Sequence, residues 1–351
     1  MPTSIFPNPS GVTVAVVGAT GAVGETMLAI LEERDFPIAE LVPLASARSA
    51  GSKIRFRGQD IVVRDLASFD PGGVDIALFS AGGGTSKEYA PKFAAAGAIV
   101  VDNSSAFRYD ADVPLVVAEV NPEAMKVVPR GIIANPNCST MQMVVALAPI
   151  HRAVGIERIN VCTYQSVSGG GRSAMEELGR QTAALLNGQD ADPQRFPVQI
   201  AFNLIPHIDD FMDNGFTKEE MKLVWETRKI LGDDNIMVNP TAVRVPVFYG
   251  HSEAVHIETR NKIGADAARQ LLAHAPGVEV VDERAPGGYP TPVTHASGRD
   301  PVYVGRIRED ISHPRGLDMW IVSDNIRKGA ALNAVQIAEL WLAQRETTPA
   351  S

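Results

Sequence analysis

Short apolar runs alternate with amphipathic stretches over the first 135 residues. The apolar runs are at 12–17, 40–45, 75–80, 98–102 and 132–134. Runs of this kind are typical of parallel strands that are buried on both faces. Helical spacing of apolar residues follows the first run at 23–34 and recurs at 91–96. This alternation of strand and helix predicts a doubly wound parallel sheet.

The pattern changes after residue 135, where a helix is expected to open near Ser139. Longer strands are then predicted at 158–166, 245–249, 254–259, 303–309 and 317–323, with helices at 172–186 and 218–231. Strands bunched in this way indicate a mixed or antiparallel sheet with helices on one side. A last amphipathic helix, at 330–345, could return to the first domain. We therefore expect an α/β chain with one domain at 1–136 plus 324–351 and another at 137–323.

Length and composition narrow the class of protein. A chain of 351 residues suits two domains, and 45% hydrophobic with 21% charged residues is ordinary for a globular protein. A net charge of −9 without a basic stretch disfavours a nucleic-acid partner, and no apolar run reaches the roughly 20 residues that span a membrane. Residues 1–10 are interpreted as a short tail rather than a signal peptide. With only two cysteines, a disulfide framework is not expected, and we predict a cytoplasmic protein.

A glycine-rich loop joins the first strand to the first helix. Three glycines lie at spacing three in Gly18-Ala-Thr20-Gly21-Ala22-Val23-Gly24. In such a loop one glycine permits a tight turn, one admits a pyrophosphate, and one lets helix and strand pack closely. The motif alone is weak, since glycine-rich turns also occur for structural reasons, but its position between strand and helix predicts a Rossmann-type nucleotide domain.

The end of the second strand helps to choose the nucleotide. An acidic residue there would bind a ribose 2′-hydroxyl, but the sequence is Ser46-Ala47-Arg48-Ser49. Arg48 and the two serines could hold a 2′-phosphate, which favours NADP over NAD. The alternative is a solvated surface arginine.

The hexapeptide Asn135-Pro-Asn-Cys138-Ser-Thr140 precedes the helical stretch 141–147. Cys138 is therefore expected at a helix N-terminus, where the macrodipole and free N–H groups stabilise a thiolate and an oxyanion. Cysteines are more often inert small hydrophobes, and Cys162, inside an expected strand, fits that description. Cys138 differs because polar residues surround it.

A thiolate needs a partner that handles protons. His251 follows a glycine after an expected strand, and we take it as the candidate general acid or base. His256 falls inside a strand and His151 near a helix end, so both are interpreted as structural. No paired Cys or His spacing indicates a zinc site, and no metal is expected.

Several long motifs, in order and spanning about 12–345, resemble the aspartate-β-semialdehyde dehydrogenase family. Besides the glycine loop and the cysteine hexapeptide, they are Asn-Ser-Ser-Ala-Phe-Arg at 103–108, Tyr-Gln-Ser-Val-Ser-Gly at 164–169, Glu-Thr-Arg-Lys-Ile-Leu at 226–231, Arg-Val-Pro-Val at 244–247, Gly-His-Ser-Glu at 250–253 and Asp-Asn-Ile-Arg-Lys-Gly-Ala-Ala at 324–331.

The resemblance implies a Rossmann-type domain plus an α+β catalytic and dimerisation domain with a mixed sheet. It implies a homodimer that reduces L-aspartyl-4-phosphate with NADPH, giving L-aspartate 4-semialdehyde and phosphate, and a role in lysine, methionine and threonine biosynthesis.

The resemblance also implies roles for individual residues. Cys138 would be the acyl-forming nucleophile, His251 the general acid or base, and Gln165 would orient the substrate. Arg244 would hold the substrate carboxylate, Arg108 and Lys222 the phosphate, and Glu219 would lie near the amine. The implied cofactor contacts are the loop residues Gly18, Thr20, Gly21, Ala22, Val23 and Gly24, the segment Ser46, Ala47, Arg48 and Ser49, and Ser168, Gly169 and Asn325.

Two other functions stay open. N-acetyl-γ-glutamyl-phosphate reductase shares the chemistry, but its cysteine motif is typically Gly-Cys-Tyr, whereas this chain has Asn137-Cys138-Ser139. A nucleotide-binding sensor without catalysis is disfavoured because Cys138, Gln165 and His251 are all present.

Overall fold

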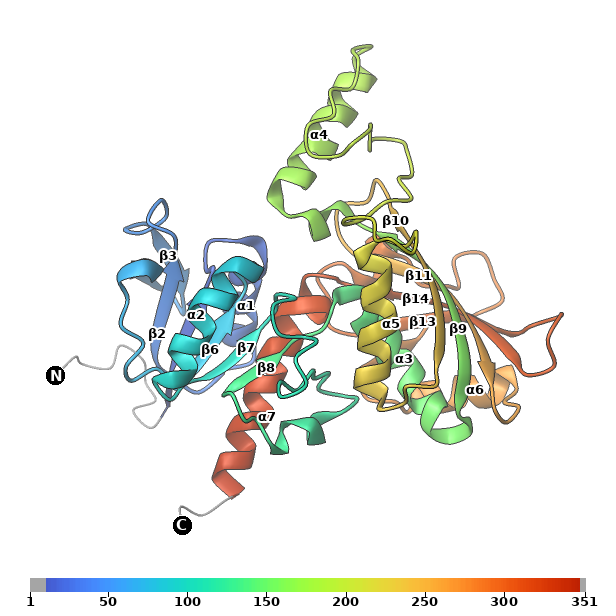
Figure 1. Ribbon diagram of the computed structural model, residues 1–351. Helices are drawn as coiled ribbons and strands as arrows, with labels where there is room; N and C mark the ends of the chain where they lie inside the picture. Colours follow the sequence, from blue (N-terminus) through green and yellow to red (C-terminus); the bar gives the residue numbers. More distant parts are fainter. Residues whose placement is uncertain (1–10, 348–351) are drawn as a thin grey trace. The chain divides into compact units, whose positions relative to one another are not determined.

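The computed structural model describes residues 11–347 of the chain, so the expected tail at 1–10 lies outside the described residues. The described chain forms two compact units (Figure 1). Residues 11–136 and 330–347 make up one unit, and Asn137–Gly329 makes up the other. From the sequence, the chain was expected to return to the first unit between residues 323 and 324. In the structure it returns between residues 329 and 330.

The first unit contains a six-stranded parallel sheet in the order β5-β2-β1-β6-β7-β8. Its strands are β1 (Val12–Val17), β2 (Ile38–Ala45), β5 (Arg64–Asp65), β6 (Ile76–Phe79), β7 (Ile99–Asp102) and β8 (Ile132–Ala134). All four residues of β6 and of β7 are buried, as expected for strands covered on both faces.

Helices cover both faces of this parallel sheet. α1 (Ala22–Glu33) and α7 (Asn333–Thr347) share one hydrophobic core with alternate residues of β1, including Val14 and Val16. α2 (Gly83–Ala95) packs on the opposite face, where the rings of Phe93 and Phe79 meet edge to face with centroids 5.4 Å apart. The predicted doubly wound α/β domain is therefore confirmed.

The predicted helix at 91–96 is wrong in extent, because α2 begins eight residues earlier at Gly83. Pro91 is the first residue of the predicted helix, but in the structure it lies inside α2. Proline removes one backbone hydrogen bond from a helix interior, and neighbouring contacts can compensate for that loss.

The second unit contains a six-stranded mixed sheet in the order β10-β9-β11-β14-β13-β12. β9 runs parallel to β10 and antiparallel to β11, β14 is antiparallel to both β11 and β13, and β12 is parallel to β13. The strands are β9 (Ile156–Gln165), β10 (Met237–Arg244), β11 (His251–Thr259), β12 (Val278–Val280), β13 (Val302–Glu309) and β14 (Gly316–Ser323). The predicted mixed sheet is confirmed.

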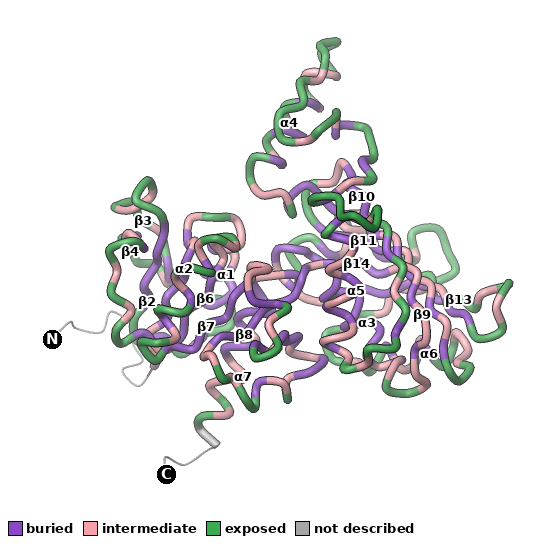
Figure 2. Tube along the Cα trace, in the orientation of Figure 1, coloured by how far each residue is buried: buried purple, intermediate pink, exposed green. Residues whose placement is uncertain are grey.

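Three helices pack on one face of the mixed sheet: α3 (Cys138–Val154), α5 (Lys218–Leu231) and α6 (Ala265–Ala273). Figure 2 shows α3 buried along most of its length between the sheet and its neighbours. α4 (Arg172–Leu186) stands away from the sheet in Figure 1 and has a small core of its own that includes Ala174 and Leu178.

The predicted strand at 245–249 is wrong. The strand is β10, which ends at Arg244, and the chain turns at once because Val247 N–H donates to the Val245 carbonyl at 2.9 Å. β10 contains Pro240 and is an edge strand, where proline is tolerated.

Five small elements were not predicted from the sequence, and the last α-helix begins at Asn333 rather than at residue 330. Those missed include the hairpin of β3 (Lys53–Phe56) and β4 (Gln59–Val62), which pairs outside the main sheets, together with α6, β5 and β12. The predicted helix at 330–345 is a π-helical turn at Arg327–Leu332 followed by α7.

Candidate active site

The glycine loop lies where the chain order of the parallel sheet reverses, between β1 and β6. Gly18 follows β1 with φ of +86°, and a Cβ there would come within 2.9 Å of the Ser80 hydroxyl after β6. A Cβ on Gly24 would overlap the Gly18 carbonyl oxygen, so this glycine permits the close packing of α1 on β1. Gly21 is the N-cap of α1, and because glycine has no side chain, the first N–H groups of the helix have no side-chain cap. Doubly wound folds bind nucleotides at such a switch point.

The segment after β2 is open to solvent. Ser46, Ala47 and Arg48 are exposed, and Thr20 donates to the Ser49 hydroxyl at 3.5 Å, so the glycine loop and this segment lie side by side. Arg48 makes no ion pair among residues 11–347. An exposed guanidinium without a partner beside the loop fits a phosphate group.

In the second unit, α3 begins at Cys138, as the sequence predicts. The Asn137 side chain caps the helix by accepting from Ser139 N–H at 3.0 Å and Thr140 N–H at 3.3 Å. Cys138 is partly exposed and is a free thiol. A Cβ on Gly329 would approach the Cys138 Cβ to 2.7 Å, so only glycine leaves room beside the thiol-bearing turn. The helix N-terminus favours the thiolate that a nucleophile requires.

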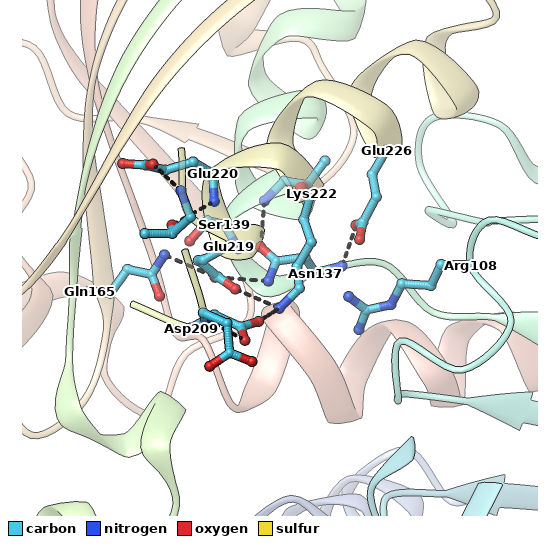
Figure 3. A network of polar contacts seen from close by, with 12 residues as sticks. Arg108, Asn137, Ser139, Gln165, Asp209, Glu219, Glu220, Lys222 and Glu226 are labelled. Atoms are coloured by element: carbon cyan, nitrogen blue, oxygen red, sulfur yellow. Dashed lines mark hydrogen bonds and ion pairs between the residues drawn. The ribbon is translucent and has the colours of Figure 1, made fainter. Parts of the chain in front are cut away.

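Glu219, near the start of α5, contacts two other predicted site residues, Gln165 and Lys222, and also Asn137 (Figure 3). Its Oε1 accepts from Asn137 Nδ2 at 2.9 Å and from Gln165 Nε2 at 3.1 Å, and its Oε2 accepts from Lys222 Nζ at 2.8 Å. Burial alone would raise the pKa of Glu219, but the Lys222 charge and these hydrogen bonds lower it to about 2. Glu219 is therefore an anion at neutral pH.

Lys222 also donates to Asp209 at 2.7 Å, so two carboxylates already neutralise its ammonium group. Burial would lower the pKa of Lys222, but these two anions raise it. Phosphate binding by Lys222 stays a prediction, and such binding would have to compete with both carboxylates.

His251 opens β11 and is fully buried. Its Nδ1 accepts from the Ser166 backbone N–H at 3.1 Å, so in the neutral ring the proton is on Nε2, which has no hydrogen-bond partner in the described structure. Burial, and then the Arg244 charge, lowers the pKa of His251 to about 3. The imidazole is thus neutral and has one N–H available to donate.

Arg244 ends β10 and is 7% exposed. It donates from Nη1 to the Ser166 carbonyl at 2.7 Å and makes no ion pair among residues 11–347. A Cβ on Gly169 would lie 3.0 Å from Arg244 Nη1 and 3.4 Å from His251 Nε2, so the three residues converge. The charges of Glu219 and Cys138 act on Arg244 without forming an ion pair, and a buried cation with no anion in direct contact is costly unless an anion completes the site.

Ser168 and Asn325 lie next to His251. Asn325 Oδ1 accepts from the hydroxyls of Ser166 and Ser168 and from Gly250 N–H at 3.0–3.1 Å, and Asn325 Nδ2 donates to Ser168 at 2.9 Å. Ser166 Oγ is also 3.1 Å from His251 Nδ1. The two predicted cofactor contacts therefore belong to the network that holds the histidine.

Arg108 belongs to the first unit, in the segment after β7. It is 6% exposed, and Nη2 donates to the Asn103 carbonyl at 2.7 Å. Its predicted phosphate contact stays a prediction.

Three residues around the site were quoted in motifs without a role. Asn137 caps α3 and reaches Glu219, Glu226 accepts from the Asn137 backbone N–H at 2.6 Å, and Ser166 sets the tautomer of His251. Their presence in the motifs was the available signal, but their contacts cross 82 to 89 positions of sequence and could not be read from it. His151 and His256 have the structural settings that the sequence predicts: His151 Nδ1 accepts from Ile156 N–H, and His256 pairs with Asp318.

Two further findings concern the described residues as a whole. Among residues 11–347 no helix is both long and apolar enough to cross a membrane. In the same part of the chain, His, Cys, Asp and Glu form no group that could hold a metal ion.

Comparison with known proteins decides the family. Residues 13–128 match the model of the semialdehyde dehydrogenase NAD binding domain, and residues 147–328 match that of the semialdehyde dehydrogenase dimerisation domain. An aspartate-semialdehyde dehydrogenase from Legionella pneumophila is 65% identical over 95% of this chain and 96% of its own. The chain belongs to the aspartate-semialdehyde dehydrogenase family. It is therefore an oxidoreductase, and the dimerisation domain supports the predicted homodimer.

Solved structures agree with this membership. Aspartate semialdehyde dehydrogenase II from Vibrio cholerae, complexed with ASA, has a TM-score of 0.93 and 58% identity, covering 96% of this chain and 99% of that one. An aspartate semialdehyde dehydrogenase with NADP from Candida albicans has a TM-score of 0.73 and 26% identity, covering 95% and 99%. Members of the aspartate-semialdehyde dehydrogenase family thus share both units of this fold.

Proposed function

We propose that this chain reduces L-aspartyl-4-phosphate with NADPH, giving L-aspartate 4-semialdehyde and phosphate, through a thioester on Cys138. The supporting observation is the convergence, in one unit, of three groups: a thiol at a capped helix start, a neutral imidazole with an available Nε2–H, and a buried arginine without a counter-charge. The names of the relatives supply the substrate class.

The proposed first half-reaction forms the thioester. The Cys138 thiolate attacks the acyl-phosphate carbon, the backbone N–H groups that open α3 stabilise the oxyanion, and phosphate leaves as the C–S bond remains. Arg244 binds the substrate carboxylate, the anionic Glu219 attracts the amino group, and Gln165, held by Glu219, orients the carbonyl. Arg108 and Lys222 are proposed to contact the phosphate.

In the second half-reaction, the bound NADPH would supply a hydride to the thioester, which gives the anion of a thiohemiacetal, while the one proton consumed overall is taken up by the departing phosphate. His251 Nε2 donates a hydrogen bond to the oxygen on which charge develops. Collapse releases the aldehyde and regenerates the Cys138 thiolate. Overall, acyl phosphate, NADPH and one proton give aldehyde, NADP⁺ and phosphate.

The glycine loop and its neighbours fit a phosphorylated dinucleotide. Gly21 is exposed at the start of α1, where a pyrophosphate would bind, Gly18 makes the turn before it, and Gly24 lets α1 pack closely on β1. We propose that Arg48, without an ion pair and beside the loop, contacts the 2′-phosphate of NADP. Ser168, Gly169 and Asn325 are proposed to contact the nicotinamide half.

A biosynthetic role in the cytoplasm follows from the same proposal. The activity would supply aspartate semialdehyde for the lysine, methionine, threonine and diaminopimelate branches. A nucleophilic thiol requires reducing conditions, and both cysteines are free.

The direct test combines an assay with a Cys138 variant. Wild-type protein should reduce NADP in the presence of aspartate semialdehyde and phosphate, more efficiently than it reduces NAD, and mass spectrometry of quenched protein should show an acyl adduct on Cys138. Cys138→Ala should lose turnover by a factor of about 10⁴ or more while it still binds NADPH. Activity only with the N-acetylated glutamate semialdehyde, or undiminished turnover in Cys138→Ala, would refute the proposal.

A further inference from the structure

Four buried polar side chains lie between α3 and the mixed sheet. They are Ser139 and Gln142 of α3, Glu253 of β11 and Ser323 of β14, and we call them the buried polar cluster. Each is at most 1% exposed. Six of their side-chain oxygen and nitrogen atoms have no hydrogen-bond partner in the described structure.

On the helix side, the cluster belongs to the turn that carries the nucleophile. Ser139 and Gln142 are three positions apart and share one face of α3, and Cys138, four positions before Gln142, lies on the same face. Ser139 follows Cys138 and its backbone N–H donates to Asn137 at the start of this helix; Figure 3 labels both Ser139 and Asn137.

On the sheet side, Glu253 and Ser323 of the buried polar cluster are neighbours of His251, which begins β11. His251 and Glu253 are two positions apart on β11 and therefore point to the same face. Ser323 is the direct antiparallel partner of His251, and α3 packs against both strands. The cluster thus joins the helix of Cys138 to the strand of His251.

Isolated polar atoms in a protein interior are costly, and native proteins satisfy nearly all of them with protein groups or ordered water. Six such atoms in one place therefore indicate bound water. Water alone would not stabilise a carboxylate there, because no charged group among residues 11–347 acts on Glu253. Its neighbours are Gln142 on α3, Thr163 on β9, Ile321 on β14 and the neutral His251 on its own strand.

Burial raises the pKa of Glu253 well above its ordinary value, and the neighbouring Gln142 amide opposes this shift only in part. A carboxylic acid has an O–H donor and a carbonyl acceptor, so it can bond to an amide, a hydroxyl and water at once. A second anion would also oppose thiolate formation at Cys138, whereas a neutral acid would not.

We propose that Glu253 is a neutral positioning residue which, with ordered water, Gln142 and Ser323, fixes the Cys138 turn of α3 relative to His251. The inference rests on the proposed function for the roles of Cys138 and His251. Glu253 itself does not touch the substrate and exchanges no proton in the reaction.

The test compares two substitutions in the full-length protein. Glu253→Gln keeps the shape, the donor and the acceptor, and should leave kcat and KM within about threefold of wild type. Its rate of Cys138 alkylation by iodoacetamide should follow the wild-type pH curve. Glu253→Leu removes the polar link and should lower kcat at least about tenfold, leave KM for aspartate semialdehyde nearly unchanged, and shift the alkylation curve.

A double variant guards against simple misfolding. Glu253→Leu with Gln142→Leu removes both partners, so it should recover melting temperature lost in Glu253→Leu but not activity. Glu177→Gln is the matched control, because Glu177 is also a buried glutamate but accepts from the backbone N–H groups of Gln194, Arg195 and Phe196. We expect Glu177→Gln to lower the melting temperature and Glu253→Gln to leave it unchanged.

Two results would overturn the inference. Glu253→Gln could lose more than about tenfold in kcat with unchanged folding, which would show that the carboxyl proton or charge is used. Alternatively, the Glu253→Leu variants could keep wild-type kcat and alkylation. Both outcomes presuppose an active wild-type enzyme, so a wild type without activity on aspartate semialdehyde would instead contradict the proposed function. The alkylation curves remain readable in either case.

Discussion

At the scale of single residues, the chemistry of this site depends on which groups carry charge in the interior. Glu219 is held as an anion by Lys222 and its hydrogen bonds, whereas His251 is held neutral by burial and by the Arg244 charge. The Ser166 N–H, pointing at Nδ1, reinforces this neutral state, because a protonated ring would have to give up that hydrogen bond. Neutral histidine and unpaired arginine together leave one donor and one cation available for an anionic substrate.

The lowered pKa of His251 makes folding stability depend on pH. As pH falls from 6.5 towards 3, the unfolded chain binds a proton that the folded chain does not, so stability present above 6.5 is lost at about 1.4 kcal/mol per pH unit. His251→Asn should remove this component. Between pH 7.5 and 5, urea unfolding of wild type should show a loss about 2 kcal/mol greater than that of the variant.

The surface residue His274 offers the control, since it is exposed on the segment after α6. His274→Asn should follow the wild-type pH dependence. Equal pH dependence in wild type and His251→Asn would show that the histidine is not held neutral in the folded state.

At the scale of elements, the contacts at the start of α3 hold Cys138 in place. Asn137 accepts from two N–H groups of the helix, donates to Glu219, and is itself held by Glu226 through its backbone. One side chain thus ends the preceding loop, caps α3 and connects it to α5. The position of Cys138 therefore depends on an element 82 residues further along the chain.

Two substitutions separate the roles of Asn137. Asn137→Ala loses the cap and should lower the free energy of unfolding by about 1–2 kcal/mol, whereas Asn137→Ser keeps a cap oxygen and should lose less. Both lose the contact with Glu219, so both should slow Cys138 alkylation and turnover. Urea unfolding and alkylation kinetics measure the two effects, and an Ala variant as stable and reactive as wild type would contradict this account.

At the scale of the whole molecule, the mixed sheet has one face covered by helices and one left open. The open face has Tyr164 and Trp320, whose rings lie 5.5 Å apart, and a hollow of about 400 Å³ bordered by Trp320 and Tyr289. The family of this unit is a dimerisation domain, and an apolar sheet face is what a second copy would cover.

We therefore expect Trp320→Asp to weaken the dimer. One chain has a mass of 37.5 kDa. Light scattering during size-exclusion chromatography should show wild type at twice this mass and the variant shifted towards the mass of one chain. Val62→Asp alters an exposed apolar residue of the first unit and should remain dimeric. A Trp320→Asp protein that stays dimeric at low concentration would place the interface elsewhere.

Much of the fold was predictable from local pattern. Buried runs such as 12–17 and 132–134 match β1 and β8 residue for residue, since a strand covered on both faces must be continuously apolar. The glycine spacing and the hexapeptide around Cys138 likewise predicted a loop and a helix start, which are local features. The pattern failed at Pro91, which was predicted to begin a helix but lies inside α2, and at 245–249, where the predicted strand follows the end of β10.

The sequence by itself thus determined the class of most elements, the place of Cys138 at a helix start, and the glycines of the loop after β1. Only the tertiary structure decided that burial lowers the pKa of His251 and raises the pKa of Glu253, that Arg244 forms no ion pair among residues 11–347, and that Lys222 forms two. The physical reason is that ionisation depends on burial and on partners brought together from distant parts of the chain, and neither is written in the residues that flank the group.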